Sequence, residues 1–377
     1  MTNPNPLRQL TDQGVAPWVD SIARDWLEKG ELRRLRDQYA IVGVTSNPTI
    51  FQKAMGEGSF YDDDILRLAR EGLGAQAIFE ALALDDIRAA ARDMEPVFQH
   101  TEGLDGRISF EVPPDLADDA EATTTATRRL WDLLDRPNVF IKIPATKAGL
   151  PAIRASIAAG INVNVTLIFS IERYREVIDA YLSGLEDRAK AGEDLSHLAS
   201  VASFFVSRVD TNVDPKLQAI IERGGPQAER ASARLGTAAI DNAKLAYEAF
   251  EASTATPRWQ ALAVAGARAQ RPLWASTSTK NPAYRDVLYC EELVARDTVN
   301  TMPIETIEAF TNHGVVRGQT VKEDLGRAHS LWSDLAELGI DEDTVGLELE
   351  REGVKKFAAS YRGAVEAIER KRAKFAG

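Results

Sequence analysis

Cysteine is nearly absent from this chain of 377 residues, because Cys290 is the only one. A lone cysteine excludes an intramolecular disulfide, and it fits a reducing compartment such as the cytoplasm. Within the stretch VLYCEEL, Cys290 is expected to be a small buried hydrophobic residue.

Motifs that bind metals or nucleotides are also missing. The four histidines are scattered, and no HxH, HExxH or Cys/His spacing occurs, so no protein-bound metal is expected. Neither a G-x-G-x-x-G nor a P-loop pattern is present, which weighs against dinucleotides and ATP. The G-x-S-x-G motif of serine hydrolases does not occur either. The sequence therefore predicts neither a metal nor a nucleotide cofactor.

Long apolar segments are lacking too. The longest uncharged stretch runs from Ala155 to Ile171, which is shorter than a typical membrane-spanning helix and includes Asn162, Asn164 and Thr166. The first ten residues, MTNPNPLRQL, lack the apolar core of a signal peptide. These features predict a soluble cytoplasmic protein without a membrane segment.

Positive charge is in deficit. The chain has 45 Lys and Arg against 57 Asp and Glu, a formal net charge of −12 at pH 7. An acidic surface repels phosphate backbones, so nucleic acid is not an expected partner. A local basic pocket for a small phosphate is still compatible with this balance.

Short strand-like runs recur along the chain, and amphipathic helical stretches such as Ser21–Tyr39 and Ile171–Ala189 fall between most of them. Alternating strand and helix signals favour βα units and a parallel sheet, and eight units suggest a (β/α)8 TIM barrel. A doubly wound open sheet is the alternative. The runs are Ala16–Asp20, Ile41–Ser46, Ile108–Val112, Val139–Ile143, Ile161–Leu167, Val201–Val206, Pro272–Ser276 and Thr298–Met302.

Two spacers between these runs are long, at about residues 51–105 and 210–270, and both have helical patterns. Neither is bounded by a Gly/Ser-rich linker, so we expect helical insertions within one domain that covers residues 1–377. The chain closes with a long predicted helix. Its apolar stripe is followed by a basic end, expected to be solvated, at Arg370, Lys371, Arg372 and Lys374.

Several strands place polar side chains on one face and apolar side chains on the other. Side chains alternate with period two, so Asn162, Asn164 and Thr166 share a face, and Lys142 faces the same way as Phe140. Because apolar faces seat the outer helices, the polar faces are predicted to point into the barrel. A satisfied internal ion-pair network is the structural alternative to an active site.

Lys142 is the strongest candidate for catalysis, because it lies between Ile141 and Ile143 and precedes Pro144. An amine taken out of water loses proton affinity, and a neutral amine attacks carbonyl carbons. The position therefore predicts Schiff-base chemistry. Glu111, two residues after Ser109 on the inward face of another strand, would favour the protonated amine if it lay nearby.

Four further residues have both structural and functional interpretations. Asp20 and Asn47 precede predicted helices, so each has the position of a helix N-cap. Arg208 could form a surface ion pair with Asp210, and Lys280, in the loop WASTSTKN, could be a solvated lysine.

The chain resembles bacterial transaldolases, most closely the longer form with an insertion before the seventh strand. The resemblance spans nearly the whole chain. It rests on VTSNPTIFQKA (44–54), ISFEV (108–112), FIKIPAT (140–146), INVNVTLIFS (161–170), ASFFVSR (202–208) and LWASTSTKNPAY (273–284).

This resemblance implies an α/β barrel and a cofactor-free enzyme of the pentose phosphate pathway. Such enzymes transfer a dihydroxyacetone unit from sedoheptulose 7-phosphate to glyceraldehyde 3-phosphate, giving erythrose 4-phosphate and fructose 6-phosphate. By position, Lys142 resembles the Schiff-base lysine, Asp20 the acid/base at the C4 hydroxyl, and Glu111 the proton-transfer partner of a water that Thr166 would hold. The family includes dimers, so a homodimer is compatible with the resemblance.

The resemblance also implies a set of contacts to the dihydroxyacetone unit. Asn47, Asn164 and Ser203 would hydrogen-bond its hydroxyls, with Ser109 near Glu111 and Phe205 lining the pocket.

At the phosphate end, Arg208 resembles the phosphate-binding arginine, and Ser276 lies on the same side. Shorter family members have a second arginine just after the serine that matches Ser276, and this chain does not. Lys280 is assigned to the phosphate instead, because a lysine can bind phosphate as a point charge.

Two other functions stay open at this stage. One is a related Schiff-base aldolase that releases dihydroxyacetone, and the other is a non-catalytic barrel that binds phosphosugars. The presence of Lys142, Asp20 and Glu111 argues against the second.

Overall fold

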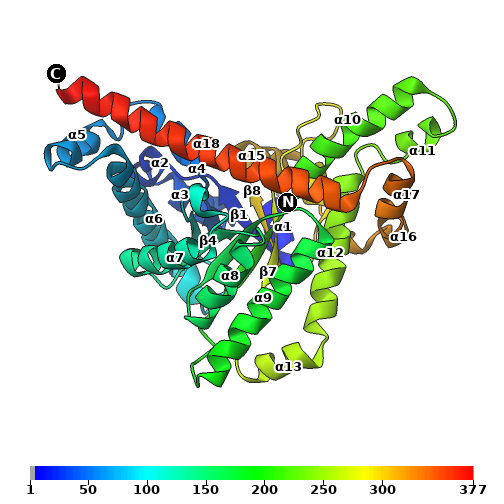
Figure 1. The fold of residues 1–377 in the computed structure, drawn as a ribbon, viewed down its shortest axis with the longest axis horizontal. Helices are drawn as coiled ribbons and strands as arrows, with labels where there is room; N and C mark the ends of the chain where they lie inside the picture. Colours follow the sequence, from blue (N-terminus) through cyan, green and yellow to red (C-terminus); the bar gives the residue numbers. More distant parts are fainter. Residues whose placement is uncertain (1–4, 377) are drawn as a thin grey trace.

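The computed structural model, which describes residues 5–376, contains eight parallel strands closed into a barrel (Figure 1). Each strand pairs with the next along the chain, and β8 pairs with β1. The predicted (β/α)8 barrel is confirmed, and each of the eight predicted runs forms a strand. The strands are β1 (Val15–Asp20), β2 (Gly43–Thr45), β3 (Arg107–Glu111), β4 (Val139–Pro144), β5 (Val163–Ile168), β6 (Ser200–Phe205), β7 (Arg271–Ala275) and β8 (Thr298–Met302).

Helices surround the barrel and fill both predicted insertions. None of those within residues 5–376 has the length and apolar character needed to cross a membrane. The first half of the chain forms α1 (Pro6–Asp12), α2 (Arg24–Lys29), α3 (Glu31–Tyr39), α4 (Pro48–Gly56), α5 (Asp62–Arg70), α6 (Ala75–His100), η1 (Pro114–Leu116), α7 (Ala120–Leu134) and α8 (Gly149–Ala158). The second half forms α9 (Ile171–Lys190), α10 (Ser207–Arg223), α11 (Ala228–Ser232), α12 (Ala238–Thr254), α13 (Pro257–Val264), α14 (Leu288–Glu292), α15 (Ile304–His313), η2 (Thr320–Lys322), α16 (Leu325–His329), α17 (Leu331–Glu337) and α18 (Glu342–Ala376).

The stretch predicted as one helix over Ser21–Tyr39 is divided into α2 and α3. Gly30 joins them with a φ of 75°, in the left-handed region where a glycine has no steric penalty. The alternation of polar and apolar residues does not reveal such a break.

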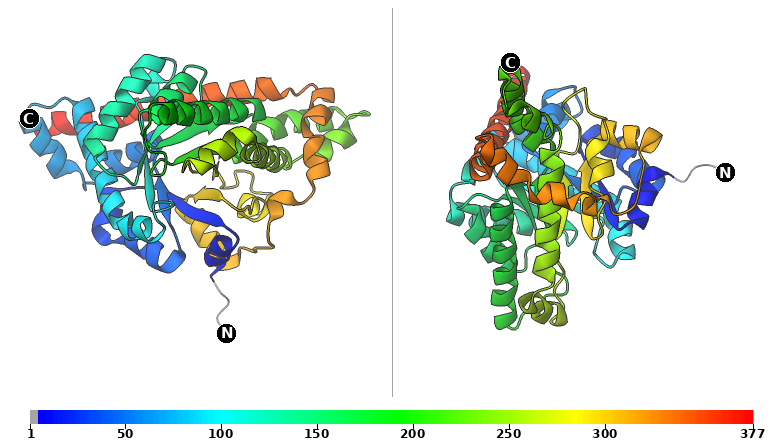
Figure 2. Two further views of the ribbon diagram at one scale, coloured as in Figure 1. Left: turned by 90° about the horizontal axis from the view of Figure 1, so that it is seen from below. Right: turned by 90° about the vertical axis from the view of Figure 1, so that its right-hand side faces the viewer.

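The long C-terminal helix α18 crosses the carboxyl end of the barrel, where the strands finish (Figure 1). In both views of Figure 2, α18 and α1 lie on opposite sides of the molecule. Phe357 and Ile368, on its predicted apolar stripe, are buried. The basic end is not simply solvated as predicted, because Lys371 pairs with Asp62 of α5 at 2.8 Å.

Aromatic side chains fill the barrel directly below the strand ends. Trp18 and Phe140 point inward two residues before Asp20 and Lys142, and their rings stack 6.2 Å apart. The guanidinium of Arg107 lies over the Phe140 ring, 4.9 Å from the ring centroid. This layer forms the floor beneath the polar side chains of the next level.

Gly43 of β2 makes room for this floor. A Cβ at position 43 would lie 2.3 Å from the Trp18 ring. Gly43→Ala is therefore expected to destabilise the protein by about 1–3 kcal/mol, because the indole would have to leave its packed position. Chemical denaturation measures the change. Gly326→Ala is the matched control, since a Cβ there meets no atom within 4 Å; equal stability of the two variants would contradict this account.

Candidate active site

Lys142 and Glu111 form a buried ion pair at the carboxyl ends of β4 and β3. The register of the two strands places these residues side by side. Lys142 Nζ lies 3.6 Å from Glu111 Oε2, and the two side chains are only 5% and 4% exposed. Lys142 Nζ also donates a hydrogen bond to the Ser46 carbonyl at 3.3 Å. The separation of the amine and the carboxylate, which the sequence leaves open, is thus short.

Glu111 is an unusual carboxylate in this position. Burial raises its pKa to about 7, although the positive charge of Lys142 acts in the opposite direction. Both of its oxygens, and the hydroxyl of buried Thr166, have no hydrogen-bond partner among residues 5–376. A group that titrates near neutrality and retains free hydrogen-bonding capacity is suited to proton transfer.

Asp20 ends β1 at the same level of the barrel. Its carboxylate accepts a hydrogen bond from Thr45 Oγ1 at 2.6 Å, and burial raises its pKa although Lys142 opposes this. The N-cap interpretation of Asp20 is wrong, because α2 begins later, at Arg24, and its cap residue Ala23 offers no side-chain bond. Asp20 therefore belongs to the polar cluster inside the barrel.

Three side chains form a continuous hydrogen-bonded chain across the barrel wall. Asn164 of β5 donates to Ser109 Oγ of β3 at 2.9 Å and accepts from Ser203 Oγ of β6 at 2.7 Å. Asn162 does not join them, because it lies before the amino end of β5. It donates to the Pro137 carbonyl and accepts from the Ala199 amide, so its role is structural.

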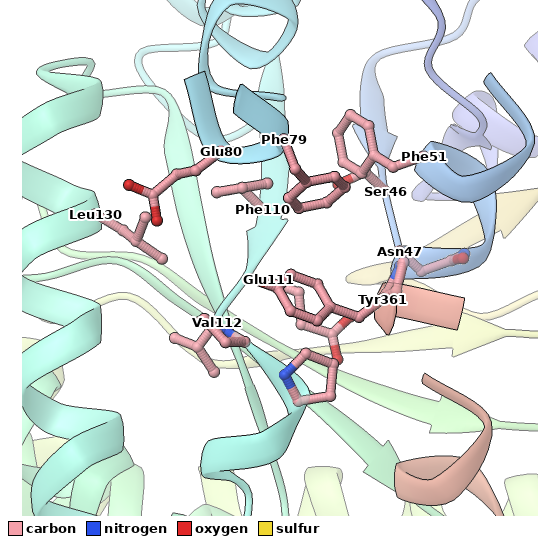
Figure 3. Close-up of a pocket in the computed structure, with 13 residues that line it drawn as sticks. Ser46, Asn47, Phe51, Phe79, Glu80, Phe110, Glu111, Val112, Leu130 and Tyr361 are labelled. Carbon is pink, nitrogen blue, oxygen red and sulfur yellow. The ribbon is translucent and has the colours of Figure 1, made fainter. Parts of the chain in front are cut away.

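Asn47 is both an N-cap and a site residue. Its Oδ1 accepts hydrogen bonds from the Thr49 and Ile50 amides, as predicted for the residue that opens α4. Asn47 and Glu111 both line a small pocket that also includes the rings of Phe51, Phe79 and Tyr361 (Figure 3). That pocket has a volume of about 20 Å³, enough for a single water, so it does not admit a sugar.

A much larger cavity of about 860 Å³ is lined by Lys142. It extends from the floor of the site to the loops beyond β6 and β7 and to the underside of α18. The predicted residues that line it are Asp20, Asn47, Lys142, Ser203, Phe205, Arg208, Ser276 and Lys280. Ser109, Glu111, Asn164 and Thr166 are buried in the wall behind this surface. The cavity therefore runs from the lysine to the residues assigned to phosphate.

Arg208 projects into this cavity rather than onto the surface. Its guanidinium lies 4.9 Å from the Phe205 ring centroid and 5.8 Å from that of Phe357. The alternative of an ion pair with Asp210 is wrong, because Asp210 accepts from the Ala239 amide and the Tyr289 hydroxyl instead. Arg208 thus presents a partly desolvated positive charge to any ligand.

Ser276 and Lys280 lie on the loop after β7. Ser276 has a φ of 57° and shares a hydrogen bond of 2.8 Å with the Ser207 hydroxyl, which joins this loop to the start of α10. Lys280 is exposed, as expected if it were only a solvated lysine. It nevertheless lines the cavity and donates a hydrogen bond to Ser278 Oγ at 2.6 Å. Its pKa is lowered by partial burial and by the nearby charges of Lys356 and Arg208.

Sequence reasoning missed several residues of the site. Thr45 and Thr301 share a hydrogen bond of 2.6 Å under Asp20, and strand alternation could have indicated that Thr45 faces inward. Lys356 and Phe357 line the cavity from α18. No local pattern brings them there, because their placement depends on how α18 crosses the barrel.

The fold and the site together define an α/β-barrel enzyme with its site at the carboxyl ends of the strands. A family model described as Transaldolase/Fructose-6-phosphate aldolase matches residues 17–368. A protein named Transaldolase from Acidothermus cellulolyticus is 52% identical over 97% of this chain and 96% of its own length. Proteins of that name from Mycolicibacterium paratuberculosis and Mycobacterium tuberculosis are each 50% identical, covering 98% and 96% of both chains respectively. The chain belongs to the transaldolase/fructose-6-phosphate aldolase family.

The helix that carries Arg208 is anchored by a buried acid, which leads to a prediction about pH. Burial and neighbouring Asp214 raise the pKa of Asp210 to about 7, so its neutral form is the one that folding favours. The stability that the neutral carboxyl group contributes is complete below the pKa that Asp210 has in the unfolded chain. It is lost as the pH rises through the pKa of Asp210 in the folded protein. Asp210→Asn, which is neutral at every pH, should match the parent near pH 4 and exceed its stability by about 1–3 kcal/mol near pH 8.

Denaturation at both pH values measures the difference. Asp334→Asn is the control. A hydrogen bond from Arg234 lowers the pKa of Asp334, so this variant should be less stable than the parent at the higher pH. A constant difference between Asp210→Asn and the parent across this range would contradict the assignment.

Proposed function

We propose that this enzyme transfers a dihydroxyacetone unit from sedoheptulose 7-phosphate to glyceraldehyde 3-phosphate, giving erythrose 4-phosphate and fructose 6-phosphate. The observation that carries the proposal is a buried lysine, paired with a carboxylate, in a cavity that ends among cationic side chains. The relatives named Transaldolase match this chain along almost its whole length, which supports transfer as the reaction.

Lys142 is the proposed nucleophile. Its Nζ attacks the C2 carbonyl of the ketose, the carbonyl oxygen leaves as water, and an imine remains. Glu111 gives and takes the protons of these steps through a water held by Thr166. The pKa of Glu111 near 7 and the free hydrogen-bonding atoms of both residues support this role.

Asp20 is the proposed base for carbon–carbon cleavage. It removes the proton from the C4 hydroxyl, the C3–C4 bond breaks, and its electrons move to the imine, leaving a bound enamine and a free aldose phosphate. An acceptor aldehyde then adds to the enamine by the reverse steps. Asp20 and Lys142 line the same cavity, and Thr45 holds the carboxylate in place.

The remaining site residues hold the substrate. Asn47, Asn164 and Ser203 are proposed to bind the dihydroxyacetone hydroxyls, with Ser109 supporting Asn164 and Phe205 forming an apolar wall. The hydrogen bonds that join Ser109, Asn164 and Ser203 keep donors and acceptors in fixed directions, which supports retention of the enamine until an acceptor arrives.

Arg208, Ser276 and Lys280 are proposed to bind the phosphate at the far end of the cavity. Arg208 lies in the first turn of α10 after β6, and Ser276 and Lys280 lie on the loop after β7. All three are at the carboxyl end of the barrel, where the active sites of this fold lie. The guanidinium of Arg208 supports this role most directly, because it lines the cavity and forms no ion pair within residues 5–376.

Release of dihydroxyacetone is the second candidate function, since the matching family model also covers fructose-6-phosphate aldolases. It uses the same imine and differs only in the fate of the enamine. A product assay with and without an acceptor aldehyde distinguishes the two. A non-catalytic phosphosugar-binding barrel would leave the buried Lys142–Glu111 pair without a role.

We further propose that residues 1–377 fold as one domain and work in the cytoplasm on sugar phosphates, as a homodimer. Contacts of α18 with α4, α5, α6 and α10 support one folding unit. Cys290 is buried, and burial raises its pKa to about 12, which suits a structural cysteine in a reducing compartment. The homodimer rests on the family resemblance alone.

Borohydride trapping tests the nucleophile. With fructose 6-phosphate and borohydride, intact mass should show one reduced dihydroxyacetone adduct, located on Lys142 by peptide mapping. Lys142→Ala should lose the adduct completely. Lys53→Ala, which changes another lysine of the same cavity, should retain it. An adduct on a different lysine would overturn the assignment.

A substitution at Asp20 separates imine formation from bond cleavage. Asp20→Asn keeps the size of the side chain and removes its charge, so turnover should fall by about 10²–10⁴, the usual contribution of a general base. Trapping should continue, but the adduct should shift from the three-carbon unit to the whole sugar. Asp25→Asn, on the exposed side of α2, is the control and should keep normal turnover. Normal turnover in Asp20→Asn would mean that Asp20 has a structural role and is not the base.

A further inference from the structure

The helix α18 lies unusually close to the mouth of the barrel around Gly353. A Cβ at position 353 would be 2.8 Å from Leu167 Cδ2 and 3.4 Å from the Arg208 guanidinium. Leu167 itself has a φ of 61° where the register between β5 and β6 shifts. The absence of a side chain on Gly353 therefore allows this turn of α18 to rest directly on the site.

Phe357, one helical turn further on, faces into the cavity and is 4% exposed. Its ring centroid lies 5.7 Å from Lys142 Nζ and 5.8 Å from the Arg208 guanidinium carbon. Both cations thus share one aromatic neighbour supplied by α18. This contact sets the rotation of α18 and brings the residue before Phe357 to the cavity as well.

That residue is Lys356, which is exposed and lines the cavity with Arg208 and Lys280. The three side chains line one cavity, and the charges of Lys356 and Arg208 both lower the pKa of Lys280, so Lys280 lies close enough to each of them to be repelled. Glu352, one turn earlier on α18, also lines the cavity and attracts Arg208. No ion pair of Lys356 occurs within the described part of the chain.

The carboxylates that line the cavity are those of Asp20 and Glu352, and they face a larger number of cations. Arg208, Lys280 and Lys356 lie there together with Lys53, Lys142 and Lys216, which leaves a net positive pocket on a protein whose net charge is −12. Such an arrangement costs free energy through like-charge repulsion unless an anion with more than one negative charge lies between the cations. A phosphate monoester, with close to two negative charges at neutral pH, has the required charge and the oxygens to accept from three donors.

We propose that Lys356 of α18 is a specificity-determining residue that binds the substrate phosphate together with Arg208 and Lys280. This inference rests on the proposed function and extends it, because it assigns part of the phosphate site to the C-terminal helix. It also accounts for the loop after β7, where the chain has Ser276-Thr-Ser-Thr-Lys280 and no second arginine. Lys356 of α18 supplies the positive charge that a second arginine in this loop would carry.

Lys356→Gln tests the proposal, with Lys355→Gln as the matched control. Lys355 is its neighbour on α18, is exposed and does not line the cavity. In Lys356→Gln, KM for fructose 6-phosphate and the inhibition constant of inorganic phosphate should both rise about tenfold, the usual effect of one hydrogen bond to a charged group. Borohydride trapping of unphosphorylated dihydroxyacetone should be retained.

Lys356→Arg should restore tight phosphate binding, since a guanidinium also donates to phosphate. Equal constants for Lys356→Gln and Lys355→Gln would overturn the proposal. Loss of dihydroxyacetone trapping together with phosphate binding would overturn it as well, because that result means a packing role for Lys356.

Titration calorimetry of inorganic phosphate separates this inference from the proposed function. If the parent protein shows no trapping and no transfer, the proposed function fails. A tenfold weaker phosphate affinity of Lys356→Gln, with Lys355→Gln unchanged, would still support the cation site in that case.

Discussion

The buried Lys142–Glu111 pair is the constraint on which the rest of the site depends. Charges removed from water are costly unless they are paired and close, and here two adjacent strands place them 3.6 Å apart. The same burial raises the pKa of Glu111 into the neutral range, so the carboxyl group can exchange protons under working conditions. A lysine on a surface loop would have neither the partner nor the low dielectric that this chemistry needs.

The surroundings of this pair keep bulk water away from it on two sides. Below it, the stacked rings of Trp18 and Phe140 fill the barrel, and Gly43 leaves room for them. Above it, Phe357 of α18 covers the cavity between the lysine and Arg208. An enamine is lost when it is protonated by stray water, so an enclosed site favours transfer to an acceptor. Floor and cover come from segments more than 200 residues apart in sequence.

The end of the cavity that we propose binds phosphate is built differently from the end that holds Lys142. Its cations come from loops and from a helix rather than from strand interiors, and they stay closer to solvent. Their positions depend on supports behind them, such as the shared hydroxyl contact of Ser276 with Ser207 and the buried contacts of Asp210. The dianion that we propose binds here would relieve the charge repulsion among the cations, so this end of the cavity is organised for a ligand rather than for its own stability.

The barrel, its eight strands and the inward placement of Lys142 and Glu111 could be predicted from the sequence, because period-two alternation is a local property of a strand. Partners across space could not. Thr45 under Asp20, the separation of Arg208 from Asp210, and Lys356 above the cavity all depend on how distant elements pack. Alternation states which face a side chain takes, but only the closed barrel and the course of α18 decide which residues meet there.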